Sequence, residues 1–122
     1  MRYVLALDLK DGPAVVRAYK RHHRAVWPEV QRSLRRVGVR AMDIYLLGRR
    51  LVMVMEAKPG FHRSRDFARH VASDPRCAEW EALMKTLQRR APGAKRGEWW
   101  ALMEPVFHLQ PQARRKVGAL RR

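Results

Sequence analysis

Alternating apolar and polar side chains predict strands at both ends and in the middle of the chain. Within residues 2–9 every second side chain is large and apolar, which is typical of a strand with one face in a core. Residues 39–47 and 50–57 contain further runs of apolar side chains that predict two strands, and Gly48 between them predicts a hairpin. A last strand is expected over residues 98–109.

The first segment between strands has the period of a helix. Residues 14–37 carry apolar side chains about 3.6 positions apart, after a helix start at Pro13. Pro28 lies inside this pattern, where it removes a backbone hydrogen bond and clashes with the preceding turn. The helix should therefore kink near residues 24–27, or break there and restart.

The second segment between strands predicts two shorter helices. One is expected over residues 64–72. Asp74 followed by Pro75 is a strong start signal for another helix, expected over residues 76–90. The Pro- and Gly-containing stretch 91–97 predicts a loop before the last strand.

The resulting order β-α-β-β-α-β is that of the ferredoxin-like α+β fold, an antiparallel sheet with helices on one face. The strand at residues 51–55 is apolar on both sides, as is much of residues 99–103. A sheet with one solvated face should alternate cleanly. Because helices on one side cannot cover both faces, we expect a homodimer in which two sheets face each other.

Length and composition fit one domain. The chain has 122 residues, of which 47% are hydrophobic. We assign residues 1–109 to this domain and residues 110–122 to a basic tail that we expect to be mobile. Cys77 is the single cysteine, so no internal disulfide is expected. No apolar run of about 18 residues predicts a membrane span, and the short N-terminal stretch does not resemble a secretory signal, so we expect a cytoplasmic protein.

The formal net charge of +16 invites a nucleic-acid interpretation. The basic residues are scattered through every predicted element, however, and do not gather in one stripe. An RNA-recognition domain shares the same element order but needs base-stacking aromatic residues on its third strand. Residues 51–56 contain none, so nucleic acid is not an expected partner.

Three aromatic side chains on the first predicted helix form the main candidate site. Tyr19, His23 and Trp27 are spaced four residues apart and share one helix face. This spacing alone favours packing in a core. The other interpretation is a pocket, because histidine suits proton transfer at neutral pH and an aromatic ring suits the C–H face of a sugar.

The run Tyr19-x-x-x-His23-x-x-x-Trp27-Pro28-Glu29 resembles the helix signature of the L-rhamnose mutarotase family. The likeness extends over residues 3–109 and includes further matches at residues 44–46, 74–80 and 104–107. It implies a dimeric ferredoxin-like α+β barrel. It also implies a sugar mutarotase without a cofactor, which interconverts the α and β anomers of a 6-deoxy-L-hexose.

The resemblance also implies residue roles. His23 would be the proton donor, while Tyr19 and Trp80 would contact the sugar. Two positions depart from the rhamnose-type pattern, with Met42 in place of a tyrosine and Glu81 in place of the second tryptophan of a pair. The reaction type is kept, but L-fucose becomes as plausible a substrate as L-rhamnose.

Ring opening of a hemiacetal needs one proton delivered to the ring oxygen and one removed from the anomeric hydroxyl. The second proton carrier stays open between Tyr19, Glu29, and the substrate or water; Trp27 is a further candidate for sugar contact. No metal site is expected, since His62 and His70 lack a third ligand and are read as surface residues. The alternatives are another dimeric α+β barrel enzyme, such as a cofactor-free monooxygenase, a non-catalytic basic binding protein, or an inactive relative.

Overall fold

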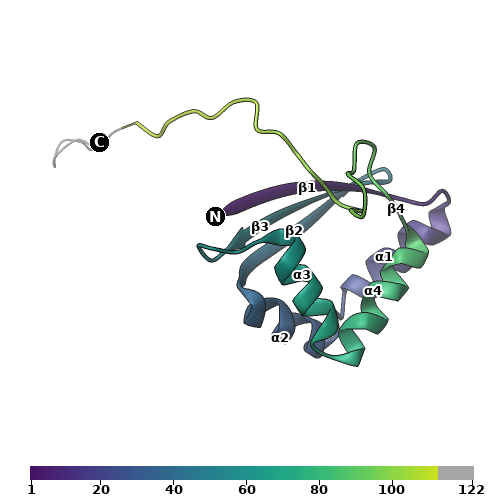
Figure 1. The fold of residues 1–122 in the computed structure, drawn as a ribbon. Helices are drawn as coiled ribbons and strands as arrows, with labels where there is room; N and C mark the ends of the chain where they lie inside the picture. The colour runs from purple at the N-terminus through teal and green to yellow at the C-terminus, as the bar shows by residue number, and fades with distance from the viewer. Residues whose placement is uncertain (113–122) are drawn as a thin grey trace, which may run out of the picture.

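One antiparallel sheet carries all the helices on a single face (Figure 1). The computed structural model describes residues 1–112, so most of the predicted tail lies outside the described residues. The strands are β1 (Arg2–Leu9), β2 (Val39–Leu47), β3 (Arg50–Ala57), β4 (Gln88–Arg89) and β5 (Ala101–Leu102). The helices are α1 (Pro13–His23), α2 (Pro28–Val37), α3 (Arg63–Ala72) and α4 (Pro75–Leu87).

The strand order confirms the predicted ferredoxin-like α+β fold. The sheet runs β2-β3-β1, and the free edge of β1 is shared by β4 and β5. Leu9 pairs with Gln88 in β4, whereas Leu5 pairs with Leu102 in β5. The sheet therefore has four strand positions, and the last position is filled by two short strands from separate parts of the chain.

The core lies between the helices and one side of the sheet. On β1 this side carries the buried Leu5, Leu7 and Leu9. Two apolar clusters fill the layer, one around Leu7 and Trp80 and the other around Leu5 and Met55. Trp100 packs against both clusters, so it lies where they meet.

The predicted break in the first helical segment is confirmed. α1 ends at His23 and α2 begins at Pro28. Between them Trp27 has an extended backbone, with φ −57° and ψ 136°. Proline at the first position of a helix needs no N–H partner, so Pro28 starts α2 where it could not continue α1. The break leaves His23 in the last turn of α1.

Two predicted boundaries near the C-terminus were wrong. The helix expected to reach residue 90 ends at Leu87, and Gln88 pairs with Leu9 of β1 instead. Because β1 offers an unpaired edge there, sheet hydrogen bonds outweigh one more helical turn. The last expected strand, residues 98–109, is reduced to β5; its ladder ends where Met103 N–H donates to the Val4 carbonyl at 2.8 Å. Pro105, two residues later, has no N–H to extend it.

Of the two histidines predicted to lie at the surface, His62 does and His70 does not. His62 is exposed, and its Nδ1 accepts a hydrogen bond from the Arg65 N–H at the start of α3. His70 is buried, with its Nδ1 2.7 Å from the Ser33 hydroxyl. Burial lowers the pKa of His70 below the usual 6.5. Cys77 is buried in the core, as free cysteines usually are.

A buried carboxylate organises the start of α3. Asp66 is fully buried and accepts the backbone N–H of His62 at 2.8 Å. The guanidinium groups of Arg65 and Arg69 cover it with N–O distances of 3.0 and 2.9 Å. The hydrogen bonds from Arg65 and from the His62 backbone hold the pKa of Asp66 well below its usual range.

We predict that Asp66→Asn lowers the melting temperature at pH 7 by about 4 °C or more, because the ionised carboxylate is lost. A depressed carboxyl pKa contributes stability that is lost as the pH falls through the acidic range. The difference between variant and wild type should therefore narrow below about pH 4. Thermal unfolding followed by circular dichroism from pH 7 to pH 3 measures both effects.

Asp11→Asn is the matched control, because the Asp11 side chain is 74% exposed and pairs with arginines at the surface. It should change the melting temperature less than Asp66→Asn at every pH. Equal effects of the two substitutions would contradict the role given to Asp66.

Candidate active site

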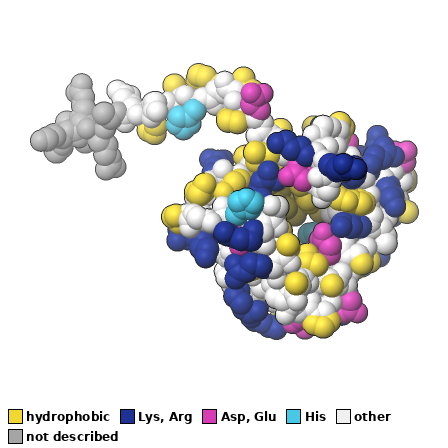
Figure 2. All heavy atoms as spheres, viewed as in Figure 1, with side chains coloured by type: hydrophobic (Ala, Val, Ile, Leu, Met, Phe, Trp, Pro, Cys, Tyr) yellow, Lys and Arg dark blue, Asp and Glu magenta, His cyan; other side chains and the backbone are white. Residues whose placement is uncertain are grey.

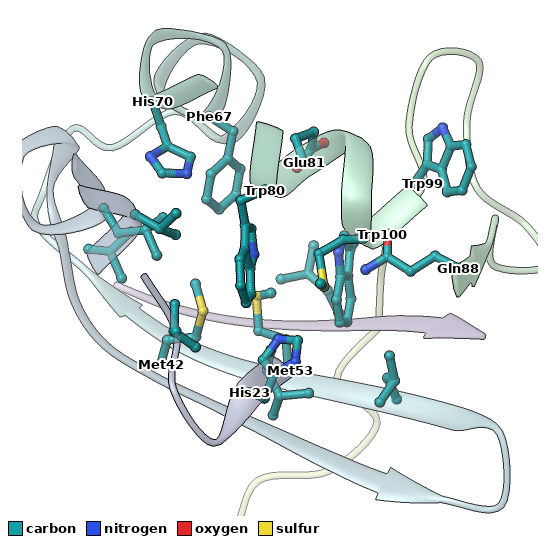
Figure 3. A pocket seen from close by; sticks show the side chains of 18 of the residues that line it. His23, Met42, Met53, Phe67, His70, Trp80, Glu81, Gln88, Trp99 and Trp100 are labelled. Atoms are coloured by element: carbon teal, nitrogen blue, oxygen red, sulfur yellow. The ribbon is translucent and has the colours of Figure 1, made fainter. Parts of the chain in front are cut away.

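A pocket of about 1130 Å³ opens between the helices and the sheet. Figure 2 shows it as a hollow with apolar walls and charged side chains around its mouth. Parts of all four helices, strands β1 to β4, the break at residues 24–26 and the segment 97–100 line it. Figure 3 shows aromatic and polar side chains converging on this space.

Three aromatic rings form the part of the pocket nearest to the break after α1. The His23 ring stacks on Tyr19, with ring centres 4.1 Å apart and planes inclined by 28°. The rings of His23 and Trp80 pack edge to face, with their centres 5.4 Å apart. Tyr19 and Trp80 are buried and His23 is half-buried. These three residues, predicted from separate parts of the sequence, lie together.

One hydrogen bond decides how the His23 imidazole is protonated. Its Nδ1 lies 2.9 Å from the backbone carbonyl oxygen of Tyr19, one turn earlier. A carbonyl oxygen can only accept, so Nδ1 carries the proton and Nε2 has a free lone pair when the ring is neutral. Burial lowers the pKa of His23 below the usual 6.5; the Tyr19 carbonyl opposes this shift and the charge of His22 adds to it. At pH 7 the ring is therefore mainly a neutral base.

The pKa of the Tyr19 hydroxyl is shifted upwards, so this group keeps its proton more firmly than an exposed tyrosine does. Burial raises the pKa of its hydroxyl, and the side chain of Gln88 acts against that shift. The hydroxyl therefore stays protonated at any pH at which the protein would work. Tyr19 offers the pocket a neutral hydrogen-bond donor and acceptor.

The other predicted site residues divide into two groups. Met42, Trp80 and Glu81 line the pocket together with Tyr19 and His23. Trp27 and Glu29 are not among the lining residues. The Trp27 ring supports Trp80 from behind, with ring centres 5.1 Å apart, and its other neighbour is the Arg76 guanidinium at 3.7 Å. The Glu29 carbonyl oxygen lies 3.7 Å from the Cys77 sulfur.

Sequence reasoning missed several lining residues. Neighbouring residues of the expected strand 98–109, such as Trp99 and Trp100, would point to opposite faces, yet both line the pocket because the chain bends there before β5. Gln88 was assigned to a helix and instead reaches the pocket from β4. Met53 and Phe67 complete the apolar wall. The directions of Gln88, Trp99 and Trp100 depend on where α4 ends and β5 begins, and the sequence pattern does not fix these two points.

Ion pairs and hydrogen bonds hold the mouth of the pocket. Arg63 on α3 lies 3.6 Å from Glu98, and Lys85 lies 3.6 Å from Glu81 on α4. Arg90 donates hydrogen bonds to the backbone carbonyl groups of residues 94, 95 and 98 at 3.3, 2.7 and 2.8 Å. The loop before β5 is thereby held in place beside the pocket.

Residues 1–112 show neither a cluster of metal ligands nor a membrane-spanning helix. Within this range, no three His, Cys, Asp or Glu side chains are grouped as ligands of a metal ion would be. None of the helices described in it has both the length and the apolar character needed to cross a membrane.

The sequence is similar to known proteins over most of its length. A family model described as L-rhamnose mutarotase matches residues 2–109. An L-fucose mutarotase from Xanthomonas campestris pv. campestris is 40% identical over 110 residues, covering 88% of this chain and 87% of the relative. A UPF0734 protein from Dictyostelium discoideum is 36% identical over 88% of both chains. An L-rhamnose mutarotase from Burkholderia orbicola is 29% identical, covering 87% of this chain and 97% of the relative.

Two solved structures share the fold. An L-rhamnose mutarotase from Formosa agariphila superposes with a TM-score of 0.64 at 20% identity, covering 90% of this chain and 99% of that one. Tetracenomycin F2 cyclase from Streptomyces glaucescens superposes with a TM-score of 0.55 at 18% identity, covering 91% and 98%. At these identities the likeness concerns the fold alone.

We predict that His23 titrates below pH 6.5 and is neutral at pH 7 with its proton on Nδ1, because of its burial and its bond to the Tyr19 carbonyl. Long-range ¹H–¹⁵N NMR of the imidazole, recorded from pH 5 to 8, reports both the midpoint and the tautomer. The His23→Gln variant identifies the resonance. A midpoint above 6.5, or a proton on Nε2, would contradict the geometry described here.

Proposed function

This chain belongs to the L-rhamnose mutarotase family and is a sugar mutarotase, and we propose that it interconverts the α and β anomers of L-fucose in preference to those of L-rhamnose. The main support for the reaction is the neutral His23, with its free Nε2, beside Trp80 in a pocket. The 40% identity to an L-fucose mutarotase, against 29% to an L-rhamnose mutarotase, supports the choice of sugar.

His23 enters the reaction as the base. Its Nε2 takes the proton from the anomeric hydroxyl, the bond between C1 and the ring oxygen breaks, and C1 becomes an aldehyde. Rotation about the C1–C2 bond turns the other face of the aldehyde to the ring-closing hydroxyl. On closure His23 returns its proton to the new anomeric oxygen, and so becomes the proton donor that the family resemblance implies.

The ring oxygen must gain a proton when the ring opens. The Tyr19 ring stacks on His23 and its hydroxyl keeps its proton, so the hydroxyl donates a hydrogen bond to the departing ring oxygen. A water molecule gives that oxygen its proton on ring opening and takes a proton back from it when the ring closes. Glu29 is not used as the second acid or base, because it is not among the pocket-lining residues.

The pocket walls match the two sides of a 6-deoxy sugar. Trp80 offers an aromatic face to the C–H groups of the ring. Met42 and Met53 offer an apolar surface to the methyl group at C6, where most hexoses carry a hydroxyl. Trp27, behind Trp80, fixes the indole and contributes to sugar binding through it.

We expect wild-type protein to accelerate exchange between the α and β anomers of L-fucose, and more slowly those of L-rhamnose. The measurement is two-dimensional NMR exchange spectroscopy on equilibrated sugar. His23→Gln should lower the exchange rate by about 100-fold or more. The rate should fall below the lowered pKa of His23, where the base is protonated, and level off above it.

His22→Gln is the control, because it removes the neighbouring imidazole, which is not a pocket-lining residue. It should exchange at close to the wild-type rate. Equal loss in the two variants, or no exchange with either sugar, would contradict the proposal; faster exchange of L-rhamnose would overturn the sugar preference alone.

We also propose that the protein is a homodimer in which the open faces of two sheets meet. The helices cover one face only (Figure 1). On the other face Val4 pairs with Val54, and Val52 pairs with Tyr45, so apolar side chains stand directly opposite one another. Tyr45 is 61% exposed in the single chain, and Met103, which lies opposite Val4, is 44% exposed. Such a continuous apolar face is rarely left uncovered.

The segment after β5 supports the same assembly. It runs away from the body of the chain, with apolar side chains on view (Figure 2). Val106, Phe107 and Leu109 are 92%, 81% and 77% exposed. A second copy would cover them, and a symmetric pair of such segments makes a self-complementary interface.

We predict a molar mass of twice 14.3 kDa in light scattering coupled to size-exclusion chromatography. Val54→Asp, which buries a charge between the sheets, should give the mass of one chain. Ala78→Asp, on the exposed side of α4, should remain dimeric. A wild-type mass of 14.3 kDa at high concentration would contradict the assembly.

A further inference from the structure

Gln88 is a buried polar side chain that the reaction as described does not use. Its exposed fraction is 6%. Its backbone is held by pairing with Leu9 of β1, which fixes the direction in which the side chain leaves the sheet edge. Figure 3 shows its amide pointing into the pocket beside Trp100.

The amide has more hydrogen-bonding groups than its surroundings satisfy. It carries two N–H groups and a carbonyl oxygen. The polar side chain beside it is Tyr19, whose hydroxyl pKa it influences. If one Gln88 N–H donates to the Tyr19 oxygen, the second N–H and the amide carbonyl have no hydrogen-bond partner among residues 1–112. Buried polar groups are nearly always hydrogen-bonded, so this pair is arranged for a partner that enters the pocket.

The surroundings of Gln88 give no structural reason for an amide. Met84, one turn earlier on α4, is buried and apolar, and so is Leu9 across the ladder. An unbranched apolar side chain of similar length would fill the same space and leave no polar group unpaired. The amide is therefore better explained by ligand binding than by packing.

We propose that Gln88 and the Tyr19 hydroxyl together bind one hydroxyl group of the sugar ring, which makes Gln88 a specificity-determining residue. A sugar hydroxyl both donates and accepts, so it accepts a hydrogen bond from a Gln88 N–H and donates one to the Tyr19 oxygen. Both partners are uncharged, as suits a neutral sugar. The inference rests on the mutarotase function proposed above.

A hydrogen-bonded site of this kind discriminates by what it rejects. A sugar that lacks the bound hydroxyl leaves the Gln88 amide and the Tyr19 hydroxyl buried without partners. Removing the Gln88 amide from the protein should therefore have little further effect on the affinity for a sugar that already lacks the bound hydroxyl. A purely structural role for Gln88 would weaken all sugars alike.

The test compares the dissociation constants of L-fucose and its 2-, 3- and 4-deoxy analogues, measured by tryptophan fluorescence. Gln88→Met keeps the length of the side chain and removes the amide. The Gln88→Met variant should bind L-fucose about tenfold or more weakly than wild type does. It should bind the analogue that lacks the recognised hydroxyl as wild type does. Tyr19→Phe should act on the same analogue, and the double variant should lose less than the product of the two single effects.

Gln112→Leu, an exposed glutamine at the far end of the described chain, controls for the loss of an amide elsewhere. Melting temperatures show whether Gln88→Met is folded; if it is not, Tyr19→Phe with the same analogues carries the comparison. Gln88→Met that binds every sugar as wild type does, or weakens all four equally, overturns the inference. Wild type that binds L-fucose without exchanging its anomers would contradict the mutarotase proposal and leave the binding test of Gln88 valid.

Discussion

The site depends on the inability of proline to continue a helix. Pro28 prevents α1 and α2 from forming one continuous helix. α1 therefore stops at His23, and the chain turns at Trp27 before α2 begins. His23 thus lies in a last turn, with its imidazole free to hydrogen-bond to the Tyr19 carbonyl. Arg24, Ala25 and Val26, which form the break, line this end of the pocket.

Burial then favours the neutral form of both His23 and Tyr19. It lowers the pKa of His23 and raises the pKa of Tyr19, since the charged form of each group is disfavoured away from water. One environment thereby supplies a base with a free lone pair and a hydroxyl that keeps its proton. No charged partner is needed to tune either group, which is economical for a substrate that carries no charge itself.

Local signals explain which parts of the fold could be predicted from the sequence. β1, β2 and β3 have the expected bounds, because their runs of apolar strand-forming residues and the turn at Gly48 are encoded within a few residues. The break at Pro28 follows from the chemistry of one side chain. Tyr19, His23 and Trp80 could be proposed from spacing and family resemblance, and the structure brings them together.

Contacts distant in sequence explain what could not be predicted. Gln88 leaves the helical pattern only because β1 has an open edge nearly eighty residues earlier in the chain. Trp100 turns into the pocket because β5 begins one residue after it, on that same edge. The free edge of β1 therefore positions one wall of the site, much as the break at Pro28 positions the other. A pocket built from two such walls is compatible with a strongly basic chain, because its buried polar groups are neutral and the cations of residues 1–112 lie at its mouth or on the outer surface.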